Sequence, residues 1–341
     1  MNTPQESFAI VGLGKMGGNL ARQALEKGLR VVGQTMGGPP ADLLAQGMTS
    51  IDRLQELRTA LRPPRAVILY IPAGSAVDDV LDQLSEILQP DDVVADGGNS
   101  YWGDSIRRHE RLARRRIGFV DVGTSGGIEG ARQGACFMVG GEPPAVARFE
   151  PILKALALPG GYVHAGPPGA GHFVKLVHNG IEFGMLQAIG EGIDLLEHYH
   201  APLPVADILR NWRHGSVIRS WLIDLMERAY REQHGLKSVD SYVEDTGEVN
   251  WLVDDAMHME VAIPVIAQSV MQLIASRDQY RNSTRAVAMM RHGFGGHPYG
   301  HAGGIADERH HGRIGGFTGA VQGSSAATSD RPAPGNQGPA H

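Results

Sequence analysis

The fold is decided near the start of the chain, in the stretch FAIVGLGKMGGN, residues 8–19. Residues 8–11 form a short apolar run typical of a buried β-strand, and Gly12, Gly14 and Gly17 follow in the pattern GxGxxG. The first glycine permits a tight turn, the second lets the backbone approach a pyrophosphate, and the third lets helix and strand pack closely. Because a helix begins here, its unpaired N–H groups would face the phosphates. The stretch therefore predicts a turn that binds a dinucleotide.

The rest of the first half extends this pattern. Residues 19–27 have a helical period that ends at Gly28, which suits a helix C-terminus because glycine adopts left-handed backbone without penalty. Short apolar runs then alternate with amphipathic stretches, as in βαβ units around a parallel sheet. The strands that we expect are 8–11, 31–33, 67–71, 93–96, 118–122 and 135–139.

The second half has a different character. Proline and glycine are dense at 158–161 and 166–171, so we place a domain boundary near residue 165. Helical periods then replace strand patterns as far as about Arg291. The segment 299–341 has too few aliphatic residues to offset its ordering entropy, and we expect disorder there. We predict an α/β Rossmann-like, doubly wound domain over 1–165, an all-α domain over 166–298 and a disordered low-complexity tail over 299–341.

Composition excludes several classes of function. The 341 residues include 31 Lys plus Arg and 37 Asp plus Glu, and this balance leaves no basic surplus for nucleic acid or an anionic membrane. Neither a membrane-spanning run nor a secretion signal is evident, so we expect a cytoplasmic protein whose partners are small molecules. Cys136, the single cysteine, excludes an internal disulfide and a cysteine-cluster metal site, and its apolar neighbours favour a core position. We expect no bound metal.

The end of the second expected strand leaves the choice of cofactor open. Gln34 and Thr35 stand where an acidic residue would hold the ribose 2′-hydroxyl of NAD, or where an arginine would bind the 2′-phosphate of NADP. Either side chain could hydrogen-bond to either ribose. NAD is slightly favoured, because a 2′-phosphate would have no cation beside it.

A second group of polar residues lies in the run GHFVKLVHNGIEF, residues 171–183. Lys175, His178, Asn179 and Glu182 occupy positions i, i+3, i+4 and i+7, which places them on one face of a helix. A solvated charged face would have the same spacing, but the apolar neighbours favour a buried helix. We therefore expect the four side chains to project into a cleft.

This run, with DGGNS (96–100), TSGGIEGAR (124–132) and GLGKMGGN (12–19), resembles the decarboxylating 6-phosphogluconate dehydrogenases over residues 7 to about 298. The chain length is similar to that of their shorter, mostly bacterial branch. The lysine-to-asparagine spacing and the Ser-Gly-Gly loop are shared with all β-hydroxyacid dehydrogenases, such as 3-hydroxyisobutyrate dehydrogenase. Lysine, histidine, asparagine and glutamate together on this helix, after DGGNS, are typical of the 6-phosphogluconate enzymes.

The resemblance implies oxidative decarboxylation of 6-phospho-D-gluconate to D-ribulose 5-phosphate and CO2 with NAD or NADP. Lys175 would be the base for the C3 hydroxyl, and Glu182 the acid that protonates C1. Oxidation at C3 makes a β-keto acid, and protonated Lys175 can stabilise the enolate left by loss of CO2. Because Lys175 must start neutral, its pKa must fall from about 10.4, and we expect a bell-shaped pH profile.

The resemblance also implies binding residues. Ser125, Gly126 and Gly127 would hold the substrate carboxylate, while Arg291 and His297 would reach the phosphate bound to the other subunit of a homodimer or higher homo-oligomer. The substrate-binding residues that we expect are Asn99, Ser125, Gly126, Gly127, His178, Asn179, Arg291 and His297. The expected cofactor-binding residues are Gly12, Leu13, Gly14, Lys15, Met16, Gly17, Gln34, Thr35, Pro72, Ala73 and Asn99.

The chain departs from the family pattern at several phosphate donors. Phe183 replaces a frequent tyrosine, Thr246 and Glu248 replace a lysine and a threonine of the longer branch, and Leu273 replaces an arginine. Each lost charged hydrogen bond is worth roughly 1.5 to 3 kcal/mol. The candidates to compensate are Arg219, Arg285 and Arg291.

Two alternatives therefore stay open. One is a sibling β-hydroxyacid dehydrogenase that acts on another sugar acid or a small 3-hydroxyacid. The other is a non-catalytic nucleotide-binding protein, which would have no need of Asn99, Lys175, Asn179 and Glu182.

Overall fold

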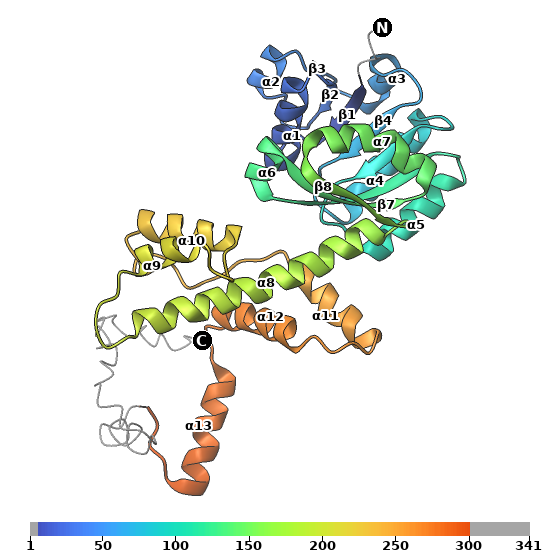
Figure 1. Cartoon of the computed structure of the whole chain (residues 1–341). Helices are drawn as coiled ribbons and strands as arrows, with labels where there is room; N and C mark the ends of the chain where they lie inside the picture. Colours follow the sequence, from blue (N-terminus) through green and yellow to red (C-terminus); the bar gives the residue numbers. More distant parts are fainter. Residues whose placement is uncertain (1–5, 301–341) are drawn as a thin grey trace, which may run out of the picture. The chain divides into compact units, whose positions relative to one another are not determined.

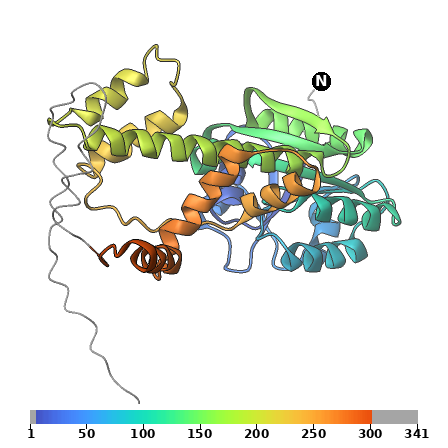
Figure 2. The same ribbon diagram turned by 90° about the horizontal axis from the view of Figure 1, so that it is seen from below.

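The computed structural model describes residues 6–300 (Figure 1). They divide into two compact units, which we describe separately: unit 1 runs to Ile181 and includes Thr246–Ile263, and unit 2 contains Glu182–Asp245 and the described residues from Pro264 onward. The helix α8 (Ala170–Glu197) continues from one unit into the other as a single uninterrupted helix (Figures 1 and 2). The boundary that we placed near residue 165 lies before this helix and stays a prediction.

Unit 1 is built on an eight-stranded sheet of order β3-β2-β1-β4-β5-β6-β7-β8. Strands β1 to β6 are parallel, β7 is antiparallel to β6, and β8 is parallel to β7. The bounds are β1 (Ser7–Val11), β2 (Arg30–Gln34), β3 (Thr49–Ser50), β4 (Ala66–Leu69), β5 (Val93–Asp96), β6 (Gly118–Ser125), β7 (Ala135–Gly141) and β8 (Ala157–Gly166). All six expected strands are present.

The strand β8 was not expected, because it runs through Pro159, Gly160 and Gly161, which the sequence analysis took as a break. It lies at the edge of the sheet, where the missing N–H of proline and the weak strand preference of glycine are tolerated. The prediction for Cys136 was also wrong. Its side chain is exposed on β7, although the neighbouring Ala135 and Phe137 are buried, since successive residues of a strand face opposite sides.

Helices cover both faces of this sheet (Figure 1). Along β1, Phe8 and Ile10 join a core cluster with α1 and α7, while Ala9 and Val11 join a second cluster with α4 and α5. The helices of unit 1 are α1 (Lys15–Glu26), α2 (Ala41–Ala45), the 3-10 helix η1 (Leu54–Glu56), α3 (Leu57–Ala60), α4 (Ser75–Ile87), α5 (Trp102–Ala113), α6 (Gly127–Gln133), α7 (Pro143–Leu156), the first part of α8, and α11 (Glu248–His258). The expected doubly wound α/β architecture is confirmed.

Many of the predicted site residues lie in loops that follow the carboxyl ends of the parallel strands. In such a sheet these ends lie at one edge, and ligands bind where the strand order reverses. The reversal lies between β1 and β4, and the loops after β1, β4, β5 and β6 contain the glycine turn, Pro72 and Ala73, Asn99, and the Ser-Gly-Gly run.

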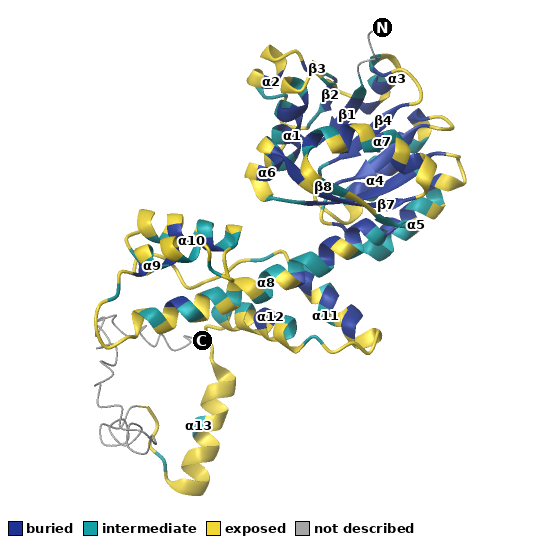
Figure 3. Ribbon diagram, in the orientation of Figure 1, coloured by how far each residue is buried: buried dark blue, intermediate teal, exposed yellow. Residues whose placement is uncertain are grey.

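Among the described residues of unit 2, the regular elements are all helices, as expected. It contains the rest of α8, α9 (Val205–Trp212), α10 (Trp221–Glu232), α12 (Pro264–Arg277) and α13 (Asn282–Gly295). Its small core joins Ile193 of α8 to Val205, Leu209 and Ile223 of α9 and α10. In contrast, α13 buries none of its residues (Figure 3). The predicted tail lies outside the described residues, except for Tyr299 and Gly300.

In the described part of the chain, no helix combines the length and apolar character needed to cross a membrane.

Candidate active site

The glycine turn after β1 has the geometry of a dinucleotide site. Gly12 has a φ of +95°, and a Cβ there would lie 2.3 Å from the carbonyl oxygen of Tyr70. A Cβ on Gly17 would lie 2.0 Å from the carbonyl oxygen of Gly12, whereas a Cβ on Gly14 would meet nothing within 4 Å. Helix α1 starts at Lys15 without an acidic residue in its first turn or a side-chain cap. The turn therefore fits a pyrophosphate approaching Gly14 and the helix N-terminus.

The remaining predicted cofactor residues lie around this turn or on the loop after β4. The Gly12 N–H donates to the carbonyl oxygen of Gln34 over 2.9 Å, which places the end of β2 beside the glycine turn. Gln34 and Thr35 are half-buried, and Pro72 and Ala73 are exposed before α4. Leu13 is buried, Lys15 is exposed and Met16 is half-buried.

The first turn of α8 packs directly against the backbone of β6 and β7. A Cβ on Gly171 would lie 2.5 Å from the carbonyl oxygens of Asp121 and Met138, and a Cβ on Gly123 would lie 2.5 Å from the Cβ of Lys175. The buried carboxylate of Asp121 accepts hydrogen bonds from the N–H groups of Gly169 (2.7 Å) and His172 (2.8 Å). Asp121 therefore fixes the beginning of the helix that carries Lys175. This role of Asp121 was not predicted from the sequence, although an aspartate within an apolar strand is a signal of a buried polar contact.

Four of the predicted residues meet on α8 and β6. Lys175 is only 8% exposed, and its Nζ donates to Oδ1 of Asn179 over 2.5 Å. The same Nζ lies 3.5 Å from Nδ1 of His178, whose Nε2 is 3.0 Å from Oγ of Ser125. Ser125 is followed by Gly126 and Gly127, which have positive φ angles and lead into α6. A buried amine, an imidazole, an amide and a hydroxyl thus form one cluster beside a glycine-rich helix start.

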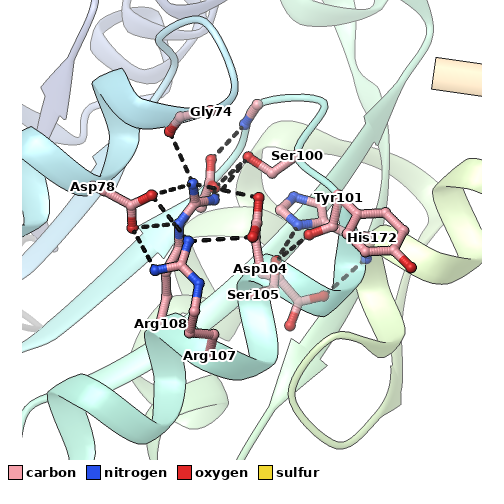
Figure 4. A network of polar contacts seen from close by, with 12 residues as sticks. Gly74, Asp78, Ser100, Tyr101, Asp104, Ser105, Arg107, Arg108 and His172 are labelled. Atoms are coloured by element: carbon pink, nitrogen blue, oxygen red, sulfur yellow. Dashed lines mark hydrogen bonds and ion pairs between the residues drawn. The ribbon is translucent and has the colours of Figure 1, made fainter. Parts of the chain in front are cut away.

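The buried Arg108 forms hydrogen bonds with both ends of the loop that contains Asn99 (Figure 4). Nη1 of Arg108 donates to Asp96 and Ser100, both over 3.2 Å, and Nη2 donates to the carbonyl oxygen of Gly74 over 2.9 Å. Oγ of Ser100 also donates to Asp96 over 2.7 Å. Arg108 therefore joins both ends of the Asn99 loop to the loop after β4, while Asn99 itself is exposed.

The acidic partner of this network is Asp78 on α4. Both Arg107 and Arg108 donate to its carboxylate, at distances of 3.0 to 3.3 Å (Figure 4). Burial alone would raise the pKa of Asp78, but the hydrogen bonds and charges of Arg108 and Arg107 outweigh it and lower the pKa from 3.8 to about 2. The network of Asp78, Ser100 and Arg108 was not predicted from the sequence, because nothing local distinguishes Arg108 from the arginines around it.

Helix α11 closes the other side of the Asn99 loop. The carboxylate of Asp255 accepts from the Tyr101 hydroxyl (2.9 Å) and from Nε1 of Trp102 (2.7 Å), and the Trp251 ring packs edge-on to Tyr101. Burial and the neighbouring Asp255 raise the pKa of Tyr101 to about 12. At the start of α11, Oε1 of Glu248 accepts from Nδ2 of Asn99 over 3.4 Å.

The other predicted site residues belong to unit 2. Glu182 and Phe183 are half-buried on α8, two turns beyond Lys175. Arg291 is exposed on α13, and His297 follows that helix. Their roles rest on the resemblance. Among the described residues, no three His, Cys, Asp or Glu side chains are grouped so as to hold a metal ion.

Comparison with known proteins bears directly on this site. The family model described as the NAD binding domain of 6-phosphogluconate dehydrogenase matches residues 7–166, and that of the 6-phosphogluconate dehydrogenase C-terminal domain matches residues 171–311. YqeC of Bacillus subtilis, placed by name among the 6-phosphogluconate dehydrogenases, is 41% identical over 85% of this chain and 98% of its own length.

Two further relatives agree. An NAD(+)-dependent, decarboxylating 6-phosphogluconate dehydrogenase of Haloferax volcanii is 39% identical over 85% of this chain and 97% of its own length. The structure of Plasmodium falciparum 6-phosphogluconate dehydrogenase, at 24% identity, has the same fold, with a TM-score of 0.74 over 83% of this chain and 64% of that one. With both family models matched in order around the Lys175 cluster, the chain belongs to the 6-phosphogluconate dehydrogenase family.

Proposed function

We propose that this protein catalyses the NAD(P)-dependent oxidative decarboxylation of 6-phospho-D-gluconate to D-ribulose 5-phosphate and CO2. The observation that carries the proposal is the buried amine of Lys175, held by Asn179 beside the His178 and Ser125 pair. A sibling enzyme for small hydroxyacids would share the lysine and asparagine, but the family models and the relatives favour the 6-phosphogluconate branch.

The residues of the chain divide the chemistry between them. A nicotinamide bound beside the glycine turn would accept the hydride from C3. Lys175 takes the proton of the C3 hydroxyl and, once protonated, stabilises the enolate oxygen that forms when CO2 leaves. Asn179 fixes the direction of Nζ through its 2.5 Å hydrogen bond, so that the amine is already oriented when the substrate arrives. Glu182 on the same helix supplies the proton for C1.

The binding roles follow the same cluster. Ser125 and the backbone N–H groups of Gly126 and Gly127 hold the substrate carboxylate at the start of α6, and His178 and Asn179 bind hydroxyls. Asn99 contacts both the substrate and the nicotinamide. NAD is favoured over NADP, since the side chains at the end of β2, Gln34 and Thr35, are uncharged.

We also propose a homodimer in which Arg291 and His297 reach the phosphate bound by the partner subunit. Support comes from α13, where Met289, Met290 and Phe294 are exposed and the last is 78% exposed. Apolar side chains gathered on one exposed helix are typical of an interaction surface. Light scattering of the purified protein tests this directly, and a mass of one chain at micromolar concentration would contradict it.

The activity is tested by following reduction of the cofactor with 6-phosphogluconate, gluconate and 3-hydroxyisobutyrate, each with NAD and with NADP. We expect the highest kcat/KM with 6-phosphogluconate and release of CO2 in equal amount to reduced cofactor. A kcat/KM for gluconate equal to or above that of its phosphate ester would transfer the assignment to a sibling enzyme.

A further inference from the structure

Glu248 lies at the candidate site although no role was expected for it beyond a lost phosphate donor. It is the first residue of α11 and follows Gly247, whose φ of +82° starts the helix from a left-handed turn. Its Oε1 accepts from Nδ2 of Asn99 over 3.4 Å, and its Oε2 accepts from Oγ1 of Thr246 over 2.5 Å. The carboxylate therefore lies against the exposed side chain of Asn99.

The position of this carboxylate follows from the way α11 is anchored. Asp255 is seven residues beyond Glu248, so the two side chains share one face of the helix. Asp255 binds Tyr101 and Trp102, which directly follow the Asn99 loop. The contact between Trp251 and Tyr101 lies on the same face. A helix fixed at its far end by two hydrogen bonds and a ring contact must turn its first residue toward Asn99.

The chemistry of a carboxylate limits what can bind there. An ionised carboxylate accepts hydrogen bonds at about four positions and donates none. Asn99 and Thr246 supply two donors, and the bond from Asn99 is long. A sugar acid offers a carboxylate, hydroxyls and, when phosphorylated, a phosphate. Of these, only a hydroxyl donates to Glu248 without repulsion between like charges.

We propose that Glu248 is a specificity-determining residue that accepts a hydrogen bond from a substrate hydroxyl held beside Asn99, and that it excludes an anionic group from this position. The inference rests on the proposed function, because the resemblance to the family is what places Asn99 at the substrate. It selects a polyhydroxylated acid over a small 3-hydroxyacid. It also requires the substrate phosphate to point away from the Asn99 loop.

The test compares Glu248→Gln with the wild type, using Asp254→Asn as the matched control. Asp254 is exposed on the same helix and lies in an ion pair with His258, so its change removes the same charge at a residue outside the proposed contact with Asn99. The kcat/KM for 6-phosphogluconate is measured, and gluconate and 3-hydroxyisobutyrate are measured as substrates or as competitive inhibitors. Calorimetric binding of 6-phosphogluconate to the enzyme provides a readout that does not depend on turnover.

We expect Glu248→Gln to weaken the binding of 6-phosphogluconate and of gluconate by the same factor, about tenfold, or ~1.4 kcal/mol. Both ligands carry the hydroxyls, so the ratio between them should not change. 3-Hydroxyisobutyrate has only the hydroxyl on C3. Its kcat/KM or inhibition constant should therefore stay within twofold of the wild-type value. The control should leave all three unchanged.

Two results would overturn the inference. If Glu248→Gln binds 6-phosphogluconate more tightly than the wild type but does not bind gluconate more tightly, the carboxylate faces the substrate phosphate. If, for each of the three ligands, the kcat/KM or inhibition constant is the same in Glu248→Gln as in the wild type, Glu248 has only a structural role. Thermal unfolding of each variant separates lost binding from lost folding, and Glu248→Asp, which keeps the charge, should recover part of the binding. A wild-type enzyme inactive on 6-phosphogluconate would refute the proposed function instead, and the same comparison would then use its actual sugar acid.

Discussion

Helices α5 and α13 differ in how far the rest of the chain covers their side chains. On α5, Arg108 is 0% exposed and its guanidinium is bonded to Asp78, Asp96, Ser100 and the Gly74 carbonyl. On α13, no residue is buried, and Met289, Met290 and Phe294 face solvent (Figure 3). The first helix satisfies a buried charge entirely within its own chain. The second leaves apolar surface that the described residues of its own chain do not cover, and such surface is typical of an interaction site.

The homodimer proposed above therefore predicts different effects for changes in the two regions: changes around the Lys175 cluster of unit 1 should act on catalysis and folding, and changes on α13 should act on self-association.

The largest effect is expected at the proposed catalytic base of unit 1, Lys175. Lys175→Met should lower kcat by about 10³-fold or more, since general acid–base catalysis alone contributes roughly 10²- to 10⁴-fold. Cofactor affinity, measured by calorimetry, should stay unchanged because the glycine turn is untouched. Lys154→Met, at an exposed lysine on α7, serves as the control. Wild-type turnover in Lys175→Met would show that the base has been misassigned.

The next test breaks the frame around Asn99. Arg108→Met should destabilise the protein by about 3 kcal/mol or more, because the buried carboxylate of Asp96 would lose its cationic partner. Arg107→Met, at a side chain that is 52% exposed, should cost less than about 1 kcal/mol. Urea unfolding monitored by circular dichroism measures both. Similar costs for these neighbouring arginines would contradict the structural distinction between them.

A third test addresses α13. Phe294→Asp should weaken self-association by tenfold or more, because a charge would replace an apolar anchor, and kcat/KM for 6-phosphogluconate should fall with it. Leu158→Asp, at an exposed residue of the edge strand β8 of unit 1, should leave both the mass and the activity unchanged. Sedimentation at several protein concentrations gives the dissociation constant. An unchanged constant in the Phe294 variant would remove α13 from the interface.

The smallest expected effect is on acid stability. Since the pKa of Asp78 is about 2 in the folded protein and 3.8 ordinarily, its ion pairs stabilise the fold above about pH 4, and this contribution is lost as the pH falls toward 2. The side chain is partly exposed, so the loss should be on the order of 1 kcal/mol. The free energy of unfolding of Asp78→Asn should fall less steeply than that of wild type over this range. Parallel curves would place the acid sensitivity elsewhere.

The elements that the sequence analysis recovered are those with a local cause. The turn from Gly12 to Gly17 is readable from its glycine spacing, and at Gly17 the cause is local, because a Cβ there would meet the carbonyl oxygen of Gly12. The shared face of Lys175, His178 and Asn179 follows from helical spacing alone. The edge strand β8 was missed because Pro159 and Gly160 break most elements, and only its place at the sheet edge makes them acceptable.

The sequence alone therefore determined the dinucleotide turn, the parallel strands and the polar face of α8, because periodicity and backbone sterics act within a few residues. Tertiary structure alone decided that Arg108 is buried while Arg107 is not, that Asp121 holds the start of α8, and that Glu248 lies against Asn99. Each of these depends on groups far apart in sequence that meet only when helices pack on the sheet. Burial and hydrogen bonding, which set the role of a polar side chain, are properties of that packing.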